Sequence, residues 1–69
     1  MQKYIGWLRP LDAEFEGFTS VAYGSLAEVE AKAREIAASA LWKEWVPNGT
    51  TIRITTDGSQ QVVSLYNVD

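Results

Sequence analysis

The residues with the clearest capacity for chemistry are three carboxylates that alternate along one short segment. Asp12, Glu14 and Glu16 occupy every second position. In an extended chain their side chains project in one direction at intervals of about 6.6–6.8 Å. Such a row of negative charge can imitate a nucleic-acid backbone or meet a row of arginines on a partner. The alternative is a solvated polar loop in which Phe15 alone turns inward, and the spacing leaves both interpretations open.

Catalysis has little support in the composition. The chain contains no cysteine and no histidine, which removes the thiol nucleophile, the usual base near neutral pH and the commonest metal ligand. A pair such as Glu14 and Glu16 would need a cleft and perturbed environments to act as acid and base. No calcium-loop spacing accompanies the acids. We therefore expect no enzyme, no catalytic residue, no metal site and no cofactor.

Trp42 is a second candidate because of its position on an expected helix. If the helix continues that far, a rotation of about 100° per residue places Trp42 opposite the apolar stripe. Exposed aromatic side chains are common anchors of protein interfaces. Small side chains lead toward it at Ala27, Ala31 and Ala38. The alternative is that the helix loosens near Ala40 and lets Trp42 or Trp45 fold back over the end of the core.

The uncovered face of an expected sheet is a third candidate surface. Antiparallel sheets commonly leave one face in solvent. The side chains assigned to that face are Tyr4, Thr51, Arg53, Thr55, Val62, Ser64 and Tyr66. Base stacking there is disfavoured because the basic complement of RNA-binding sheets is missing. We therefore expect no direct nucleic-acid partner.

One helix must position these groups, and the sequence marks both of its ends. Ser25 and Glu28 form a capping box. The serine hydroxyl accepts a hydrogen bond from the backbone amide of Glu28, and the glutamate side chain accepts one from the backbone amide of Ser25. The helix is expected to run through Trp45 and to end at residues 46–49, where proline and glycine break it. Its apolar stripe is expected to contain Leu26, Val29, Ala33, Ile36, Ala37 and Ala40.

Four short segments rich in branched and aromatic residues predict strands. They span residues 2–9, 18–23, 50–56 and 61–68. Ile52 and Ile54 alternate onto one face of the third segment. In the first and last segments we assign the buried face to Ile5, Trp7, Val63 and Leu65. The order ββαββ predicts an α+β fold with one amphipathic helix packed on a four-stranded antiparallel sheet.

The composition limits the class of protein. A chain of 69 residues with 46% hydrophobic content can form one core, so we expect a single compact domain over residues 1–69. No run approaches the roughly 18 apolar residues of a membrane span, and the first ten residues lack the features of a signal peptide. We expect a cytoplasmic protein with no membrane partner. Its net charge of −3 suits a basic protein surface better than nucleic acid.

The layout resembles that of the small anti-CRISPR proteins carried by phages and mobile elements. The likeness rests on the stretch Tyr23-Gly24-Ser25-Leu26-Ala27-Glu28, on the alanine-rich helix, and on the hairpin from Ile52-Arg53-Ile54 to Val62-Val63. It covers residues 18–68 and concerns size, charge and the order of elements. The resemblance implies an inhibitor that binds a subunit of a CRISPR effector and keeps target DNA, or its adjacent recognition motif, from docking.

The leading hypothesis is therefore a non-enzymatic, protein-binding inhibitor in a bacterial host cell, whose acidic surface occupies a basic nucleic-acid-binding site. Its predicted partner-binding residues are Asp12, Glu14, Glu16, Glu28, Glu35 and Trp42. The alternative hypothesis is a small self-associating structural or regulatory module of bacterial type, which pairs through a strand edge or through the alanine strip that ends at Trp42. A monomer and a weak homodimer are both compatible with the sequence.

Overall fold

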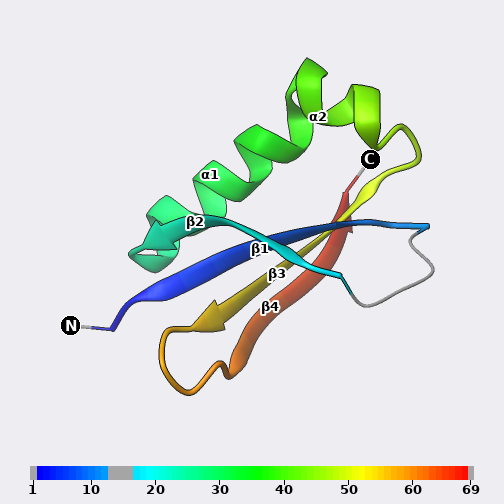
Figure 1. The fold of residues 1–69 in the computed structure, drawn as a ribbon. Helices are drawn as coiled ribbons and strands as arrows, with labels where there is room; N and C mark the ends of the chain where they lie inside the picture. Colours follow the sequence, from blue (N-terminus) through cyan, green and yellow to red (C-terminus); the bar gives the residue numbers. More distant parts are fainter. Residues whose placement is uncertain (1, 13–16, 69) are drawn as a thin grey trace.

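The chain forms two layers, a sheet of four antiparallel strands and two consecutive helices on one of its faces (Figure 1). The computed structural model describes residues 2–12 and 17–68. The elements in chain order are β1 (Tyr4–Pro10), β2 (Thr19–Gly24), α1 (Leu26–Ala38), α2 (Ala40–Trp45), β3 (Thr50–Thr56) and β4 (Val62–Val68). The α+β class and the four-stranded antiparallel sheet predicted from the sequence are confirmed.

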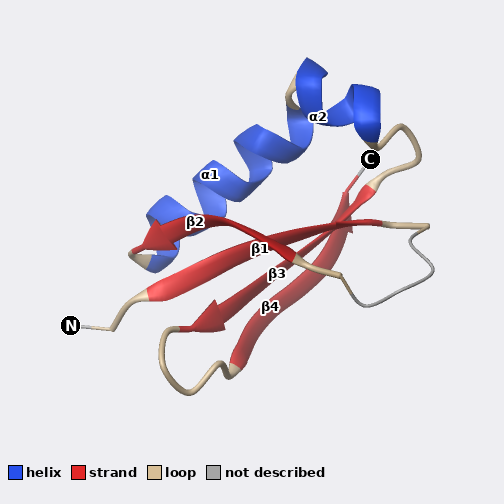
Figure 2. Cartoon of the chain, in the orientation of Figure 1, coloured by secondary structure: helices blue, strands red, loops and turns tan. Residues whose placement is uncertain are grey.

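The sheet has the strand order β2-β1-β3-β4, so that the first and third strands lie at its centre. Each hairpin, β1–β2 and β3–β4, supplies one central and one edge strand. The helices connect edge strand β2 to central strand β3 and cross over β1 on the way (Figure 2). In the central pair Gly6 lies opposite Ile54, and Trp7 lies opposite Arg53. This register fixes which side chains share a face.

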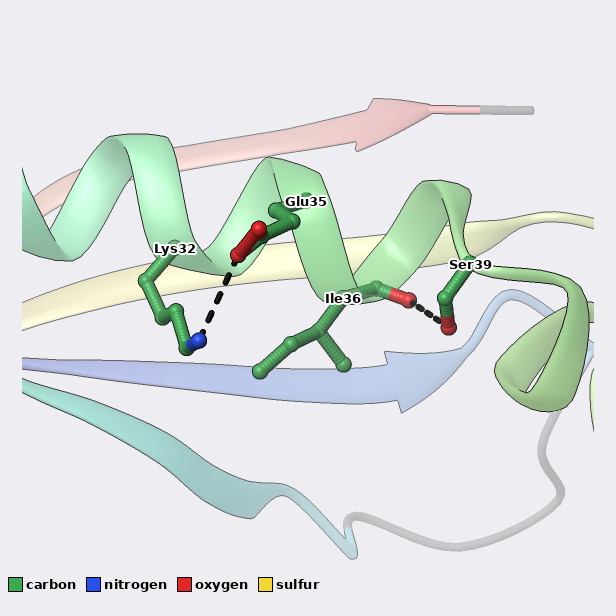
Figure 3. A network of polar contacts seen from close by, with 4 residues as sticks. All are labelled: Lys32, Glu35, Ile36 and Ser39. Carbon is green, nitrogen blue, oxygen red and sulfur yellow. Dashed lines mark hydrogen bonds and ion pairs between the residues drawn. The ribbon is translucent and has the colours of Figure 1, made fainter.

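The helical layer differs from the prediction because the helix is interrupted at Ser39. The backbone of Ser39 is extended, with φ −69° and ψ 148°. Its hydroxyl donates to the carbonyl oxygen of Ile36 at 2.8 Å (Figure 3) and accepts from the amide of Trp42 at 3.2 Å. One serine therefore ends α1 and begins α2, as expected for a side chain that competes for backbone groups. The expectation of one continuous helix through Trp45 is wrong from this residue onward.

The core lies between α1 and the two central strands. Its buried members are Leu8, Val29, Ala33, Ala37, Ile52 and Ile54. A Cβ placed on Gly6 would lie 2.9 Å from Cγ1 of Val29, so this glycine is what lets the helix approach the sheet so closely. The close approach also narrows the buried stripe of α1 to three residues at i, i+4 spacing. Leu26 and Ala40, which were assigned to the stripe, are exposed.

Two of the predicted strand faces are wrong. In β1 it is Gly6 and Leu8 that face the helix, whereas Trp7 lies on the opposite face and donates from Nε1 to Oγ1 of Thr55 at 2.9 Å. Ile5 shares that outer face through its pairing with Thr55.

In β4 the assignment is reversed in the same way. Tyr66 packs against the core, while Val63 and Leu65 are 43% and 60% exposed. The β3–β4 pairing contains a bulge: Ile54 pairs with Ser64 and Thr55 with Val62, which leaves Val63 without an opposite residue. Leu65 lies on the outer face because it pairs with Arg53 in the regular part of the ladder, and the extra residue returns Val62 to that same face, opposite Thr55. Tyr4, which was expected on the outer face, also packs against the core.

Candidate functional site

The alternating acidic segment is only partly described by the structure. Glu14 and Glu16 lie outside the described residues. Asp12 is exposed, and its carboxylate accepts a hydrogen bond from Nδ2 of Asn48 at 2.8 Å. Because Asn48 belongs to the turn between α2 and β3, Asp12 lies at the end of the molecule where α2 finishes.

Glu28 and Glu35 lie on the same side of α1, two helical turns or about 10.5 Å apart along its axis. Together with Ala31 and Lys32 they border an open depression of about 600 Å³ between α1 and β2, which we call the α1–β2 depression. Lys32 Nζ lies 3.3 Å from Oε2 of Glu35 (Figure 3). Both side chains of this pair are largely exposed, so the pair contributes little to stability.

The described acids do not form one continuous patch. Glu28 lies beside Gly24, which pairs with Tyr4 at the beginning of β1. Asp12 follows the end of the same strand, and the seven residues of β1 span about 20 Å. The structure therefore brings Glu28 and Glu35 together and places Asp12 at the opposite end of the fold.

Trp42 points back toward the core. Its ring is half-buried against the core, and Nε1 donates to Oγ1 of Thr50 in β3 at 2.8 Å. The interruption at Ser39 causes this, because the rotation of α1 no longer continues into α2. The expectation that Trp42 faces away from the core is therefore wrong. The alternative, that the helix loosens and the ring folds over the end of the core, is confirmed.

A surface that the sequence reasoning missed lies on α2. Leu41 is 71% exposed and Trp45 is 80% exposed. With three further residues they line an apolar groove of about 310 Å³, the α2 groove (Ile36, Ser39, Leu41, Trp42 and Trp45). Restarting the helical wheel at Ser39 would have revealed it, because a serine three residues before the amide of Trp42 is a helix-start signal.

The α2 groove and the α1–β2 depression meet along α1. Glu35 borders the depression and its neighbour Ile36 lines the groove. Figure 3 shows Lys32, Glu35, Ile36 and Ser39 following one another along the helix above β1 and β2. The apolar α2 groove therefore adjoins the α1–β2 depression at Glu35, whose carboxylate is paired with Lys32.

The third surface is the sheet face away from the helices. Arg53 lies there, with its guanidinium carbon 4.0 Å from the ring centre of Phe18 and 5.5 Å from that of Trp7. Thr51 donates from Oγ1 to Oδ1 of Asn67 at 2.9 Å. Thr51 and Thr55 were assigned to this face correctly, yet both are buried. Long aromatic and arginine side chains therefore cover much of the centre of this face.

Glu28 is expected to titrate at lower pH than an ordinary glutamate. The Ser25 hydroxyl donates to Oε1 of Glu28 at 2.8 Å and the Ser25 amide does so at 3.2 Å, which lowers the pKa of the carboxyl. The capping box therefore stabilises the fold above the ordinary glutamate pKa and loses this contribution as pH falls through the lowered pKa. An NMR pH titration of the Glu28 carboxyl checks this. The Ser25→Ala variant should shift the midpoint upward, and equal midpoints would contradict the explanation.

Within residues 2–12 and 17–68 no group of three or more acidic side chains is placed to hold a metal ion. Neither helix of that part of the chain is long and apolar enough to cross a membrane. Comparison with protein-family models, with curated proteins and with solved structures finds no match for this chain.

Proposed function

We propose that this domain is a non-enzymatic protein-binding module that contacts its partner through the α2 groove. The observation that carries the proposal is the exposure of Trp45 and Leu41, at 80% and 71%. A small domain needs most of its large apolar side chains for its own core. Exposed tryptophan beside other apolar groups is the usual composition of an interface hot spot.

The narrower form of the proposal is an inhibitor of anti-CRISPR type, which blocks a basic nucleic-acid-binding surface of a CRISPR effector subunit. It is supported by the net charge of −3 and by the resemblance in layout. Glu35 is adjacent in sequence to Ile36 of the α2 groove, and Glu28 lies about two helical turns further along α1, so both supply negative charge on the helix that leads to the apolar anchor. Charge in this position guides association and selects a basic partner, and the apolar groups hold the complex together. Asp12, at the other end of the described fold, remains a proposed contact, as do Glu14 and Glu16.

A second candidate function, self-association, is supported by the edge strand β4. Val62–Val68 contains no charged residue and no proline, and three of its apolar side chains, Val62, Val63 and Leu65, are at least 43% exposed. Edge strands usually carry charged residues or proline, which prevent pairing with a strand of another chain. A molecular mass by light scattering that rises with concentration, and that is unchanged in Trp45→Ala, favours this function over the first.

Truncating the α2 groove is expected to weaken partner binding by about 30-fold or more, since a hot-spot side chain contributes about 2 kcal/mol or more. The variants are Trp45→Ala and Leu41→Ala. Each is exposed, so the urea midpoint should stay near that of the wild type. The binding assay measures competition with DNA for purified CRISPR effector complexes, at low and at high salt. Leu65→Ala, on the opposite face, is the matched control.

The assay separates the possible outcomes. Wild-type affinity in both α2 variants would exclude the α2 groove as the contact surface. Two further variants replace acids by lysine, one at positions 12, 14 and 16 and the other at positions 28 and 35. If the first variant still inhibits and the second does not, the charge effect belongs to α1. If the protein competes with DNA for none of the effectors tested, the anti-CRISPR proposal is excluded. If an extract protein then binds the wild type but not Trp45→Ala, the more general proposal of a protein-binding module stands.

A further inference from the structure

We propose that the outer face of the sheet holds a binding site for a small organic acid, whose carboxylate is bound by Arg53 and whose short apolar body rests on β4. This site lies on the face opposite the helices, so it goes beyond the proposed function and does not depend on it. The three observations that carry it are the fixed position of the guanidinium, the lack of a counter-charge for it among residues 2–12 and 17–68, and the concavity beside it.

The guanidinium of Arg53 is held in place by aromatic rings. Arg53 lies at the middle of β3, opposite Trp7 in β1 and Leu65 in β4. Its carbon Cζ is 4.0 Å from the centre of the Phe18 ring and 5.5 Å from that of Trp7. Stacking of this kind fixes the plane of the guanidinium before any ligand arrives. A pre-oriented planar fork matches the two oxygens of a carboxylate.

Arg53 has no counter-charge in the described part of the chain. The ion pairs there join Lys32 to Glu35 and Arg34 to Glu30. Nε of Arg53 is shielded from solvent and has no hydrogen-bond partner among the described residues. A partly desolvated cation without a partner is unfavourable. An anion that reaches its terminal nitrogens would recover part of this loss.

The concavity beside Arg53 has the size and lining of a small-molecule site. Its volume is about 580 Å³, within the range of about 300–1,000 Å³ that is usual for such sites. Arg9 also borders the concavity, with its guanidinium stacked on Phe18 at 4.8 Å. Val62 and Leu65, 50% and 60% exposed, form an apolar wall on β4. The cation of Arg53 and the aliphatic groups of this wall together select a carboxylate with an apolar body.

The proposal is tested by NMR titration of the full chain labelled with ¹⁵N, with sodium hexanoate as the probe. We expect a saturable shift of the Arg53 Nε–H signal and of the Val62 and Leu65 amides. Hexanamide, which has the same body without the charge, should produce no such shift. Arg53→Gln is expected to weaken hexanoate binding by about tenfold or more, because a charge-assisted hydrogen bond is lost.

Matched variants separate the site from general effects of charge. Arg34→Gln removes a different stacked arginine, whose guanidinium carbon lies 4.9 Å from the centre of the Tyr66 ring on the helix side, and should leave hexanoate binding unchanged. Val62→Asp places a negative charge at the exposed rim and should abolish hexanoate binding while the fold stays intact. This variant still tests the proposal if Arg53→Gln does not fold.

Four results would overturn the proposal. The first is an equal shift with hexanamide, and the second is an unchanged hexanoate affinity in Arg53→Gln. The third is an equal effect of inorganic phosphate at the same concentration. The fourth is binding of a blocked glutamate-containing peptide in place of hexanoate. The first two would exclude charge recognition by Arg53. The last two would show a general anion site or a contact for protein segments.

Discussion

Leu8→Ala is expected to lower the free energy of unfolding by about 2–5 kcal/mol, the usual cost of deleting a fully buried leucine side chain. Leu8 is 0% exposed and lies in a central strand beneath the helix. A domain of this size has a total stability of about 3–10 kcal/mol. The variant should therefore lose a large fraction of the stability of the domain and unfold at a much lower urea concentration. Urea denaturation followed by circular dichroism measures the change.

Leu65→Ala is the matched control, because it makes the same chemical change in an edge strand. Leu65 is 60% exposed and faces away from the helices, so its loss should cost less than about 1 kcal/mol. The comparison also decides between two assignments of β4, since the sequence pattern placed Leu65 on the buried face. If Leu65→Ala were the more damaging variant, the faces of β1 and β4 described above would be wrong.

Gly6→Val is expected to destabilise the domain by about 3 kcal/mol, at the upper end of the range for overpacked cores. Even a single Cβ at this position lies 2.9 Å from Cγ1 of Val29 and 3.4 Å from Cβ of Ala22. Replacing glycine in a strand gains about 0.5–1 kcal/mol of backbone entropy, which is too little to offset the collision. Val29 is fully buried and branched at Cβ, so it has no free rotamer into which to move.

Combining Gly6→Val with Val29→Ala tests the cause directly. If the two side chains collide, the second substitution makes room for the first, and the double variant is more stable than the sum of the single effects predicts. The free energies of unfolding of the four proteins in the cycle measure this coupling. Strictly additive effects would show that Gly6→Val acts through strand conformation and not through its contact with α1.

Local signals predicted the elements and much of their arrangement. The capping box placed the beginning of α1 correctly because Ser25 and Glu28 interact within one turn. The strands and the antiparallel sheet followed from β-branched runs and turn residues, which also act locally. Ser39 carried a local signal too, but alanines on both sides made a continuous helix look favourable, and the cap was overlooked.

The faces of the strands depend on contacts that single segments do not encode. The bulge that leaves Val63 unpaired arises between β3 and β4, and the burial of Leu8 over Trp7 depends on how closely α1 can approach Gly6. The candidate sites share this limit. Glu28 and Glu35 were correctly placed on the exposed side of α1 by helical periodicity, whereas the exposure of Trp45 and the stacking of Arg53 on Phe18 follow from long-range geometry.

The three indole rings lie in three different environments, which gives this protein three separate fluorescent reporters. Trp7 is bonded to Thr55 on the outer face, Trp42 is bonded to Thr50 beneath α2, and Trp45 is exposed to solvent. Variants that keep one tryptophan and replace the other two by phenylalanine would each follow one surface. Emission from Trp45 then follows occupancy of the α2 groove, emission from Trp7 follows ligands near Arg53, and emission from Trp42 follows detachment of α2 from the sheet.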